Sequence, residues 1–324
     1  SGDDAQQGMY PEATVGVSIS STDSNPFFQG MYRSFESAAK SGNRLTVILD
    51  QADNRQDLQN TQTEAMLKRG AKALVVNLAD VSQDAAFVQT MCDRGVPVVY
   101  INRSPNTKSL ASCSNAYVVD GDAAQAGVLQ GLQVLRGWKA NPKWDKNRDG
   151  VIQYALLEGI PGHLGAQARS KWAVGTMENY PNMGVPVQKL FQETAMFREQ
   201  NAEQVTARWV KSPDFANVEV LLANNDSMAL GALKILRRYN MNLPVFGIDG
   251  SRPALEAWKA GRLTGTVFND YDGQARTALR MAANLASGRP VLDGVAYDME
   301  YRTVRVPYQD IDNNNIEHFL NLNQ

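Results

Sequence analysis

Short runs of β-branched and other apolar residues alternate along the chain with longer stretches of helical periodicity. In the first half the strand-like runs are residues 14–20, 45–49, 73–78 and 96–101. The last two are apolar nearly throughout, as strands buried on both faces of a parallel sheet are. The second half repeats the pattern at residues 151–157, 218–222, 244–248 and 264–268. Strand–helix alternation over this length predicts an α/β fold with parallel sheets.

The first helix is predicted in local detail. Asn25 is expected to be its N-cap and Pro26 its first residue, because amide side chains accept from free helix N–H groups and proline has no N–H to satisfy. Apolar residues then follow at helical spacing: Phe27, Phe28, Met31 and Phe35. A second helix is expected over residues 55–69, ending at Gly70.

The segment from Gly137 to Asp149 is the least strand-like part of the chain. It contains Trp138, Pro142, Trp144 and many charges, and we interpret it as a surface loop between two series of strands and helices. Each series is expected to form a doubly wound domain. Sheets of this kind bind ligands beyond the carboxyl ends of their strands.

Polar residues gather after the predicted strands. They are Ser21 to Asn25, Asn102, Arg103, Gly162, His163, Asn224, Asn225, Asp226, Asp249, Asn269 and Asp270. Amides and carboxylates exchange hydrogen bonds with hydroxyl groups, and arginine adds a fixed fork of donors. This set predicts a cleft for a polar, uncharged molecule that is rich in hydroxyls.

Charge and length exclude some classes of protein. The 324 residues carry 32 basic and 34 acidic side chains, and this balance argues against a dedicated nucleic-acid binder. No apolar run approaches the ~20 residues that span a bilayer. Residues 1–13 lack the features of a signal peptide, which was therefore absent, removed or omitted. An enzyme and a binding protein both remain open.

Catalytic motifs are mostly missing. The sequence has no G-x-G-x-x-G after a strand, no phosphate-binding loop, no H-E-x-x-H and no G-x-S-x-G. Of the two histidines, His318 is expected to be a solvated surface residue, whereas His163 suits a helix cap and a ligand contact equally. Carboxylates at strand ends remain a conceivable acid–base pair, but nothing marks a nucleophile.

One segment has the spacing of a calcium loop. Oxygen ligands stand at positions 1, 3, 5 and 9, a glycine at 6 and a usable carbonyl at 7: Asp145, Asn147, Asp149, Gln153, Gly150 and Val151. Position 12 is Leu156, so the usual bidentate glutamate is missing and the segment is not an EF-hand. The alternative is an Asp/Asn-rich turn that binds nothing. The joint spacing favours a metal site, completed by a distant carboxylate.

Several ordered stretches resemble the periplasmic galactose/glucose-binding proteins, which are receptors of ABC-type sugar importers and, in some bacteria, of chemotaxis. The stretches are residues 70–74, 96–99, 144–153, 161–163, 194–196, 222–226 and 304–308. The similarity runs from about Ala13 to the C-terminus. The resemblance implies a non-enzymatic periplasmic receptor, exported with a signal peptide that this chain lacks. It also implies a monomer that binds a sugar, the permease subunits and, in some bacteria, a chemoreceptor.

The resemblance also implies a fold, a type I periplasmic binding protein. Two Rossmann-like parallel-sheet lobes would be joined by a three-strand hinge and close on one monosaccharide in the cleft between them. The N-terminal lobe would comprise residues 13–121 and 269–304, and the C-terminal lobe residues 122–268 and 305–324. Residues 1–12 would be a flexible N-terminus.

The ligand residues that the resemblance implies are Asn25, Phe27, Asn102, His163, Arg169, Phe197, Asn225, Asp249 and Asn269. Phe27 and Phe197 would clamp the sugar ring between aromatic faces, although periodicity alone favours core packing for Phe27. The calcium loop would take its missing carboxylate from Glu219. The expected structural Ca²⁺ would then be held by Asp145, Asn147, Asp149, Val151, Gln153 and Glu219.

The chain departs from this family at three pocket positions. Asn25 replaces an aspartate, and Phe197 replaces a tryptophan. Gly165 replaces a carboxylate that accepts from the reducing-end hydroxyls. That acceptor is lost unless Gln167 or Glu158 takes its role. A glycoside, another aldohexose or a ribose-like aldose therefore stays open.

Two positions favour a hexose of the glucose or galactose type over a pentose. The resemblance assigns the 6-hydroxyl to His163 and Asn102, and both are present. Two other classes are weaker alternatives. A sugar-responsive repressor needs a DNA-binding headpiece of about 50–60 residues, but the first strand begins near Thr14. A carbohydrate enzyme lacks a recognisable nucleophile.

The two cysteines are predicted to form a disulfide. Cys92 ends a helix and Cys113 precedes a strand, so a parallel sheet would place both near the amino-terminal edge of the first lobe. An exported protein meets an oxidising compartment, which favours the bond. The alternative is a pair of separate buried thiols.

Overall fold

The structure is a computed structural model that describes residues 10–23, 25–41 and 44–322. The chain forms two compact units. Unit 1 contains the residues up to Gly121 together with Asp270–Val306, and unit 2 contains Asp122–Asn269 together with the residues from Pro307 onward. Each unit is an α/β structure with mainly parallel strands, so the predicted fold class is confirmed.

The chain passes from one unit to the other three times. The crossings fall at 121/122, 269/270 and 306/307, and the resemblance predicts 121/122, 268/269 and 304/305. Most of the predicted flexible N-terminus, residues 1–9, lies outside the described residues. Tyr10 is described and is buried in unit 1, with the Arg280 guanidinium carbon 4.7 Å from its ring centroid.

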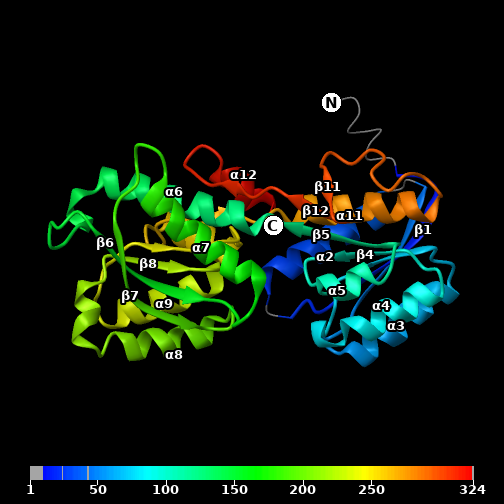
Figure 1. Ribbon diagram of the computed structural model, residues 1–324, viewed down its shortest axis with the longest axis horizontal. Helices are drawn as coiled ribbons and strands as arrows, with labels where there is room; N and C mark the ends of the chain where they lie inside the picture. Colours follow the sequence, from blue (N-terminus) through cyan, green and yellow to red (C-terminus); the bar gives the residue numbers. More distant parts are fainter. Residues whose placement is uncertain (1–9, 24, 42–43, 323–324) are drawn as a thin grey trace. The chain divides into compact units, whose positions relative to one another are not determined.

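Unit 1 is built on a sheet in the order β11-β12-β5-β4-β3-β1-β2 (Figure 1). Its strands are β1 (Ala13–Ile19), β2 (Leu45–Gln51), β3 (Ala73–Val76), β4 (Val98–Ile101), β5 (Ala116–Gly121), β11 (Met299–Glu300) and β12 (Thr303–Val306). All neighbouring pairs are parallel except β11 and β12. The buried strand runs of the sequence are therefore the centre of this sheet, as predicted.

Helices cover both faces of the unit 1 sheet (Figure 1). One face carries α2 (Pro26–Ala39) and α11 (Tyr271–Ala286). The other carries α3 (Gln56–Lys68), the short η1 (Val81–Gln83), α4 (Asp84–Asp93) and α5 (Thr107–Ala111). The cap predicted for the first helix is confirmed, because the Asn25 side chain accepts from the N–H groups of Phe27 and Phe28.

Unit 2 has a four-stranded parallel sheet in the order β7-β6-β8-β9. The strands are β6 (Ile152–Glu158), β7 (Val187–Thr194), β8 (Val220–Ala223) and β9 (Val245–Phe246). A parallel bridge from Asp249 to Phe268 extends it to β10 (Val267–Phe268), which pairs antiparallel with β13 (Gln309–Asp310). The carboxyl ends of β6 to β10 thus share one edge.

Alternate side chains of β6 face different helices. Ile152, Tyr154 and Leu156 pack with α6 (Ala123–Ala140) and α7 (Leu164–Asn179), which lie side by side over one face (Figure 1). Ala155 and Leu157 pack with α8 (Glu199–Trp209) and α9 (Asp226–Arg238) on the other. The remaining helices of unit 2 are η2 (Pro142–Trp144), η3 (Pro213–Asn217), α10 (Arg252–Lys259) and α12 (Ile316–Leu322).

Two features of unit 2 differ from the sequence prediction. The segment from Gly137 to Asp149 is not wholly a loop, since α6 continues to Ala140 and η2 follows. Nor does it separate the units, because the chain changes unit at 121/122. Strand β7 was not predicted, and it is an edge strand with a bulge opposite Tyr154 and Ala155.

The predicted disulfide is confirmed. Cys92 and Cys113 are bonded, with their Cα atoms 5.9 Å apart, at the amino-terminal edge of the unit 1 sheet. The guanidinium of Arg302 donates to the carbonyl oxygens of Leu110, Cys113 and Ala116. The disulfide and Arg302 therefore fix the same loop before β5.

Removing this disulfide is expected to lower the free energy of unfolding by about 3 kcal/mol, because it closes a short loop of the unfolded chain. The bonded residues are 21 positions apart. Urea unfolding of a Cys92→Ser, Cys113→Ser variant measures the change. A loss below about 0.5 kcal/mol would contradict this expectation. It would mean that Arg302 alone is enough to hold the loop.

Candidate functional site

Five of the predicted ligand residues follow the carboxyl ends of successive strands in unit 2. His163 comes after β6, Phe197 after β7, Asn225 after β8, Asp249 after β9 and Asn269 after β10. Parallel α/β sheets place their ligand groups at this edge. The structure thus gathers at one sheet edge residues that lie up to 106 positions apart in the sequence.

The centre of this group is a set of three residues, Arg169, Asp249 and Asn269. Arg169 Nη2 lies 3.7 Å from Asp249 Oδ1, and Asn269 Nδ2 donates to the same oxygen at 3.2 Å. Burial raises the pKa of the Asp249 carboxyl, while the charge of Arg169 and the hydrogen bond from Asn269 lower it. The arrangement offers a carboxylate acceptor beside a cationic donor, the combination that a vicinal pair of hydroxyls can bind.

Arg169 is fixed by two further partners that the sequence did not single out. Its Nη1 donates to the carbonyl oxygen of Asn224, and its Nη2 donates to the Tyr308 hydroxyl, both at 2.7 Å. Both partners lie in stretches quoted for the resemblance, 222–226 and 304–308, but nothing in the sequence pairs them with Arg169. The guanidinium is consequently held in one orientation before any ligand arrives.

The aromatic part of the site is built from Phe197 and His163. The centroids of their rings are 5.2 Å apart, and the angle between the ring planes is 74°. Phe197 has a positive φ of 59°, and its ring occupies the space beside Gly159, where an added Cβ would lie 2.2 Å from the ring. Asn225 donates to the Phe197 carbonyl oxygen at 3.1 Å, so this amide positions the aromatic residue.

His163 is the N-cap of α7, which decides one of the two roles left open by the sequence. Its Nδ1 accepts from the Ala166 N–H at 3.0 Å, and the residue is exposed. Asn225 caps α9 in the same way through the Met228 N–H. A ligand contact for either residue must therefore use the atoms that these caps leave available.

Gly165 packs closely against the His163 ring. A Cβ built on it would lie 3.0 Å from that ring and 4.0 Å from the Ala123 side chain. Glu158, one of the two suggested replacements for the lost carboxylate, accepts from the Ser170 hydroxyl at 2.7 Å. Gln167, the other, is exposed.

The three predicted ligand residues of unit 1 have partners of their own. Asn25 uses its side-chain oxygen for the helix cap. Phe27 is half-buried, and its ring packs edge-on against Tyr271, with the two ring centroids 6.4 Å apart. Asn102 follows β4 with a positive φ of 62° and donates to Asp120 Oδ1 at 3.3 Å. Asp120 was not predicted, because the sequence gives it no motif.

Comparison with protein-family models matches residues 15–290 to the periplasmic binding protein domain. The chain belongs to the periplasmic binding protein family. Members of this family are solute receptors and not enzymes, so the chain is classed as a receptor.

Relatives of this periplasmic binding protein cover nearly its whole length. The D-galactose/methyl-galactoside binding periplasmic protein of Haemophilus influenzae is 34% identical over 94% of this chain and 91% of that protein. The ribose import binding protein of Bacillus subtilis is 26% identical over 92% and 90%. A Bacillus halodurans ABC transporter solute binding protein solved with bound myo-inositol is 26% identical, with a TM-score of 0.75 and coverage of 97% and 99%. These findings show a sugar-binding receptor of ABC transport.

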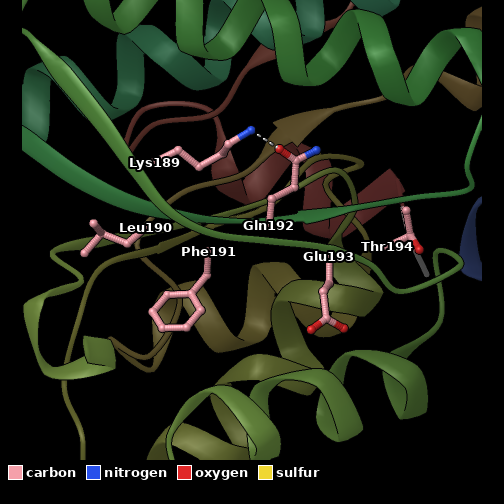
Figure 2. Close-up of a pocket in the computed structure, with 6 residues that line it drawn as sticks. All are labelled: Lys189, Leu190, Phe191, Gln192, Glu193 and Thr194. Atoms are coloured by element: carbon pink, nitrogen blue, oxygen red, sulfur yellow. Dashed lines mark hydrogen bonds between the residues drawn. The ribbon is translucent and has the colours of Figure 1, made fainter. Parts of the chain in front are cut away.

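A hollow of about 520 Å³ lies along the edge strand β7 of this periplasmic binding protein (Figure 2). Its lining residues are Lys189, Leu190, Phe191, Gln192, Glu193 and Thr194. Figure 2 shows Lys189 and Gln192 on one side of the strand, joined by a hydrogen bond, with Phe191 and Glu193 on the other. None of these six residues is a predicted ligand residue. No helix in the described part of the chain is both long and apolar enough to cross a membrane.

Proposed function

We propose that this periplasmic binding protein is a receptor for a hexose of the glucose or galactose type. The observation that carries the proposal is the set formed by Arg169, Asp249 and Asn269. Arg169 only donates, the Asp249 carboxylate only accepts, and the Asn269 amide does both, so together they match hydroxyls that each donate and accept. Phe197 adds an aromatic face for the C–H side of a sugar ring.

The choice of a hexose rests on the relatives and on two retained residues. The relative at 34% identity is named for D-galactose and methyl-galactoside. His163 and Asn102 occupy the positions that the resemblance assigns to a 6-hydroxyl. A pentose lacks the 6-hydroxyl, so in a pentose receptor this contact of the two residues would be missing.

A hexoside or a cyclic polyol is the second candidate, favoured by Gly165. Gly165 lacks the carboxylate that the resemblance places there to bind the reducing-end hydroxyls. Neither ligand carries the free reducing-end hydroxyl that the family's missing carboxylate would bind. A solved relative holds myo-inositol, which has no reducing end at all.

The proposed site of action is the periplasm, with the permease subunits of an ABC importer as the partner. The family and the named relatives support this setting. We propose that the receptor acts as a monomer, and that in some bacteria a chemoreceptor also recognises it.

Thermal unfolding with a panel of ligands tests the proposal. The panel is D-glucose, D-galactose, methyl β-D-galactoside, D-ribose and myo-inositol, each over a range of concentrations. A ligand that binds only the folded protein stabilises it by about 2.7 kcal/mol at one hundred times its dissociation constant. We expect D-glucose or D-galactose to give the largest increase in the unfolding midpoint.

The panel also separates the alternatives. A midpoint raised only by methyl β-D-galactoside or myo-inositol would transfer the assignment to the second candidate. A midpoint raised by D-ribose and by no hexose or hexoside would overturn the hexose proposal.

We further propose a structural calcium ion in unit 2. Carboxylate oxygens of Asp145, Asp149 and Glu219 lie within 4.8 Å of one another. Glu219 is 1% exposed, and burial together with the charges of the two aspartates raises the pKa of its carboxyl. The buried Gln153 Oε1 has no hydrogen-bond partner among the described residues. Three gathered carboxylates and an amide oxygen fit a hard cation such as Ca²⁺.

The proposed ligands would hold this ion at the edge of the sheet opposite the sugar residues. Gln153 lies at the start of β6, and Glu219 directly precedes β8. Glu219 already joins the loop to the sheet, since it accepts from the N–H groups of Lys146 and Gln153 at 2.6 and 2.9 Å. Asn147 and the Val151 carbonyl would complete the shell, and the bound ion would offset the repulsion among the carboxylates.

Chelation is expected to lower the unfolding midpoint and to leave sugar affinity within about threefold, because the two sites lie at opposite ends of the strands. Glu219→Gln should lower the midpoint as chelation does and respond less to the chelator. Calorimetric unfolding with EGTA or with added Ca²⁺ measures both effects.

The matched control is Glu256→Gln, which changes an exposed carboxylate of the same unit that pairs with Arg252. It should respond to EGTA as the unaltered protein does. The calcium proposal fails if EGTA leaves the midpoint of the unaltered protein unchanged. It also fails if removing Ca²⁺ abolishes sugar binding in protein that is still folded.

A further inference from the structure

One fully buried carboxyl group lies next to the proposed sugar site in the sequence and is not one of its ligand residues. Asp226 is the first residue of α9 and is 1% exposed. It directly follows Asn225 but is not among the predicted ligand residues. A buried carboxyl group is costly unless hydrogen bonds compensate for its lost hydration.

Both oxygens of Asp226 hold the backbone that follows Asp249. Oδ2 accepts from the Ser251 N–H at 2.8 Å. Oδ1 accepts from the Thr266 hydroxyl at 2.6 Å, and that hydroxyl accepts from the Gly250 N–H at 3.2 Å. The Asp226 N–H donates to the Ile248 carbonyl oxygen at 2.8 Å. Asp226 is therefore tied to the residues on both sides of Asp249.

Asp249 needs such support because its backbone is strained. Its φ is 139°, in a region that residues with a side chain rarely adopt. Strained conformations of this kind persist only where the surrounding structure holds them, and they cluster at ligand sites. Gly247 makes room for the support, since a Cβ there would lie 2.4 Å from Asp226 Oδ1.

We propose that Asp226, acting with Thr266, is a positioning residue that holds Asp249 in the strained conformation from which it accepts sugar hydroxyls. This inference rests on the proposed sugar site and adds two residues that act through Asp249 without touching the ligand. Thr266 is 1% exposed, and like Asp226 it lies beneath the turn that it holds.

The charged groups around Asp226 and Asp249 decide how this pair of carboxyl groups is protonated. Asp249 is the titratable group that acts on Asp226, whose other partners, Thr266 and Ser251, are uncharged. Burial, followed by the charge of Asp249, raises the pKa of Asp226 to about 7. Arg169 faces Asp249 from α7 and favours the ionised form of that carboxyl. Burial also raises the pKa of Asp249, so near pH 7 the coupled pair takes up a proton as a unit, and Arg169 disfavours that proton on Asp249.

This charge distribution predicts how sugar affinity depends on pH. As the pH rises through 7, Asp226 loses its proton and the two carboxylates repel each other across the turn. Bound sugar excludes water from the pair, so it favours the form that retains the proton. We expect D-galactose to bind about tenfold more weakly at pH 9 than at pH 6, the change that follows if bound sugar raises the pKa of Asp226 by one unit.

Calorimetric titration with D-galactose tests the role of Thr266. Thr266→Val removes the hydroxyl at nearly constant volume and should weaken binding at pH 6.5 at least tenfold, whereas Thr266→Ser should restore it to within threefold. Thr264→Val is the matched control, because the Thr264 hydroxyl accepts from the Val245 N–H, at the start of β9 and away from the Asp249 turn. It should bind D-galactose within threefold of the unaltered protein.

The isosteric variant Asp226→Asn tests the proton. An amide resembles the protonated acid, so this variant should bind at pH 6 within about threefold of the unaltered protein and change less than threefold up to pH 9. The inference is overturned if Thr266→Val binds as tightly as Thr264→Val, or if Asp226→Asn keeps the full pH dependence. If the unaltered protein binds no hexose, hexoside or polyol, the proposed function fails and this inference fails with it.

Discussion

Replacing Arg169 with methionine is expected to weaken sugar binding by a factor of about 30 or more, because removing one partner of a buried charge pair costs about 2–5 kcal/mol. The variant leaves the Asp249 carboxylate without its cation, and it removes donors from the Asn224 carbonyl oxygen and the Tyr308 hydroxyl. Calorimetric titration with the best ligand of the panel measures the loss.

The matched control for this prediction is Arg208→Met. Arg208 belongs to the same unit but pairs with Glu193 at the surface, where an ion pair contributes about 0–1 kcal/mol. Its sugar affinity should remain within twofold of the unaltered protein. The sugar affinity of Arg169→Lys should lie between those of Arg169→Met and Arg208→Met, since lysine keeps the charge and lacks the planar fork of donors. An Arg169→Met variant that is folded and binds within threefold of the unaltered protein would remove Arg169 from the site.

Gly127→Ala is expected to destabilise unit 2 by about 1–3 kcal/mol, because an added methyl group would overpack a contact between two helices. Gly127 lies on α6 where this helix packs closely against α7. A Cβ there would lie 2.6 Å from the Arg169 carbonyl oxygen and 2.9 Å from the Ala173 nitrogen. These are backbone atoms, so α7 must move as a whole, and Arg169 moves with it.

The control for Gly127→Ala is the same substitution at Gly175, which lies on α7 with no atom within 4 Å of an added Cβ. There the loss of a helical glycine should raise stability by about 0.5–1 kcal/mol. Urea unfolding of both variants gives the comparison, and calorimetry should find weaker sugar binding for Gly127→Ala alone. Equal stability of the two variants would contradict the close approach of the helices.

Local chemistry was the most predictable part of the fold. The cap at Asn25 and the helix start at Pro26 were predicted correctly because cap bonds reach only two or three residues along the chain. The central strands were equally plain, since burial on both faces requires runs such as 73–76 and 98–101.

Long-range packing explains the parts that were not predicted. Gly137 was assigned to the predicted loop, yet it lies inside α6, where an added Cβ would lie 2.3 Å from the Trp144 ring. Strand β7 was not predicted because its bulge breaks the alternation of apolar and polar residues, and because its charged residues are typical of an exposed edge strand. Neither packing contact nor bulge is visible in the order of residues alone.

The candidate site was predicted in part by the same logic. Strand ends led to Asn225, Asp249 and Asn269, which the structure brings to one edge of a sheet. The sequence did not show that Tyr308, from the last segment of the chain, fixes Arg169. It gave no reason to separate Asp226 from its neighbours, because the role of Asp226 depends on contacts with the turn at 249–251.

A crystal structure of the protein with D-galactose would show whether Asp249 and Arg169 bind the sugar. We expect sugar hydroxyls within hydrogen-bond distance of the Asp249 carboxylate and the Arg169 guanidinium, with a C–H face of the ring against Phe197. Sugar bound in the hollow along β7, or anywhere that leaves Asp249 and Arg169 without a contact to it, would show that the proposed site is wrong.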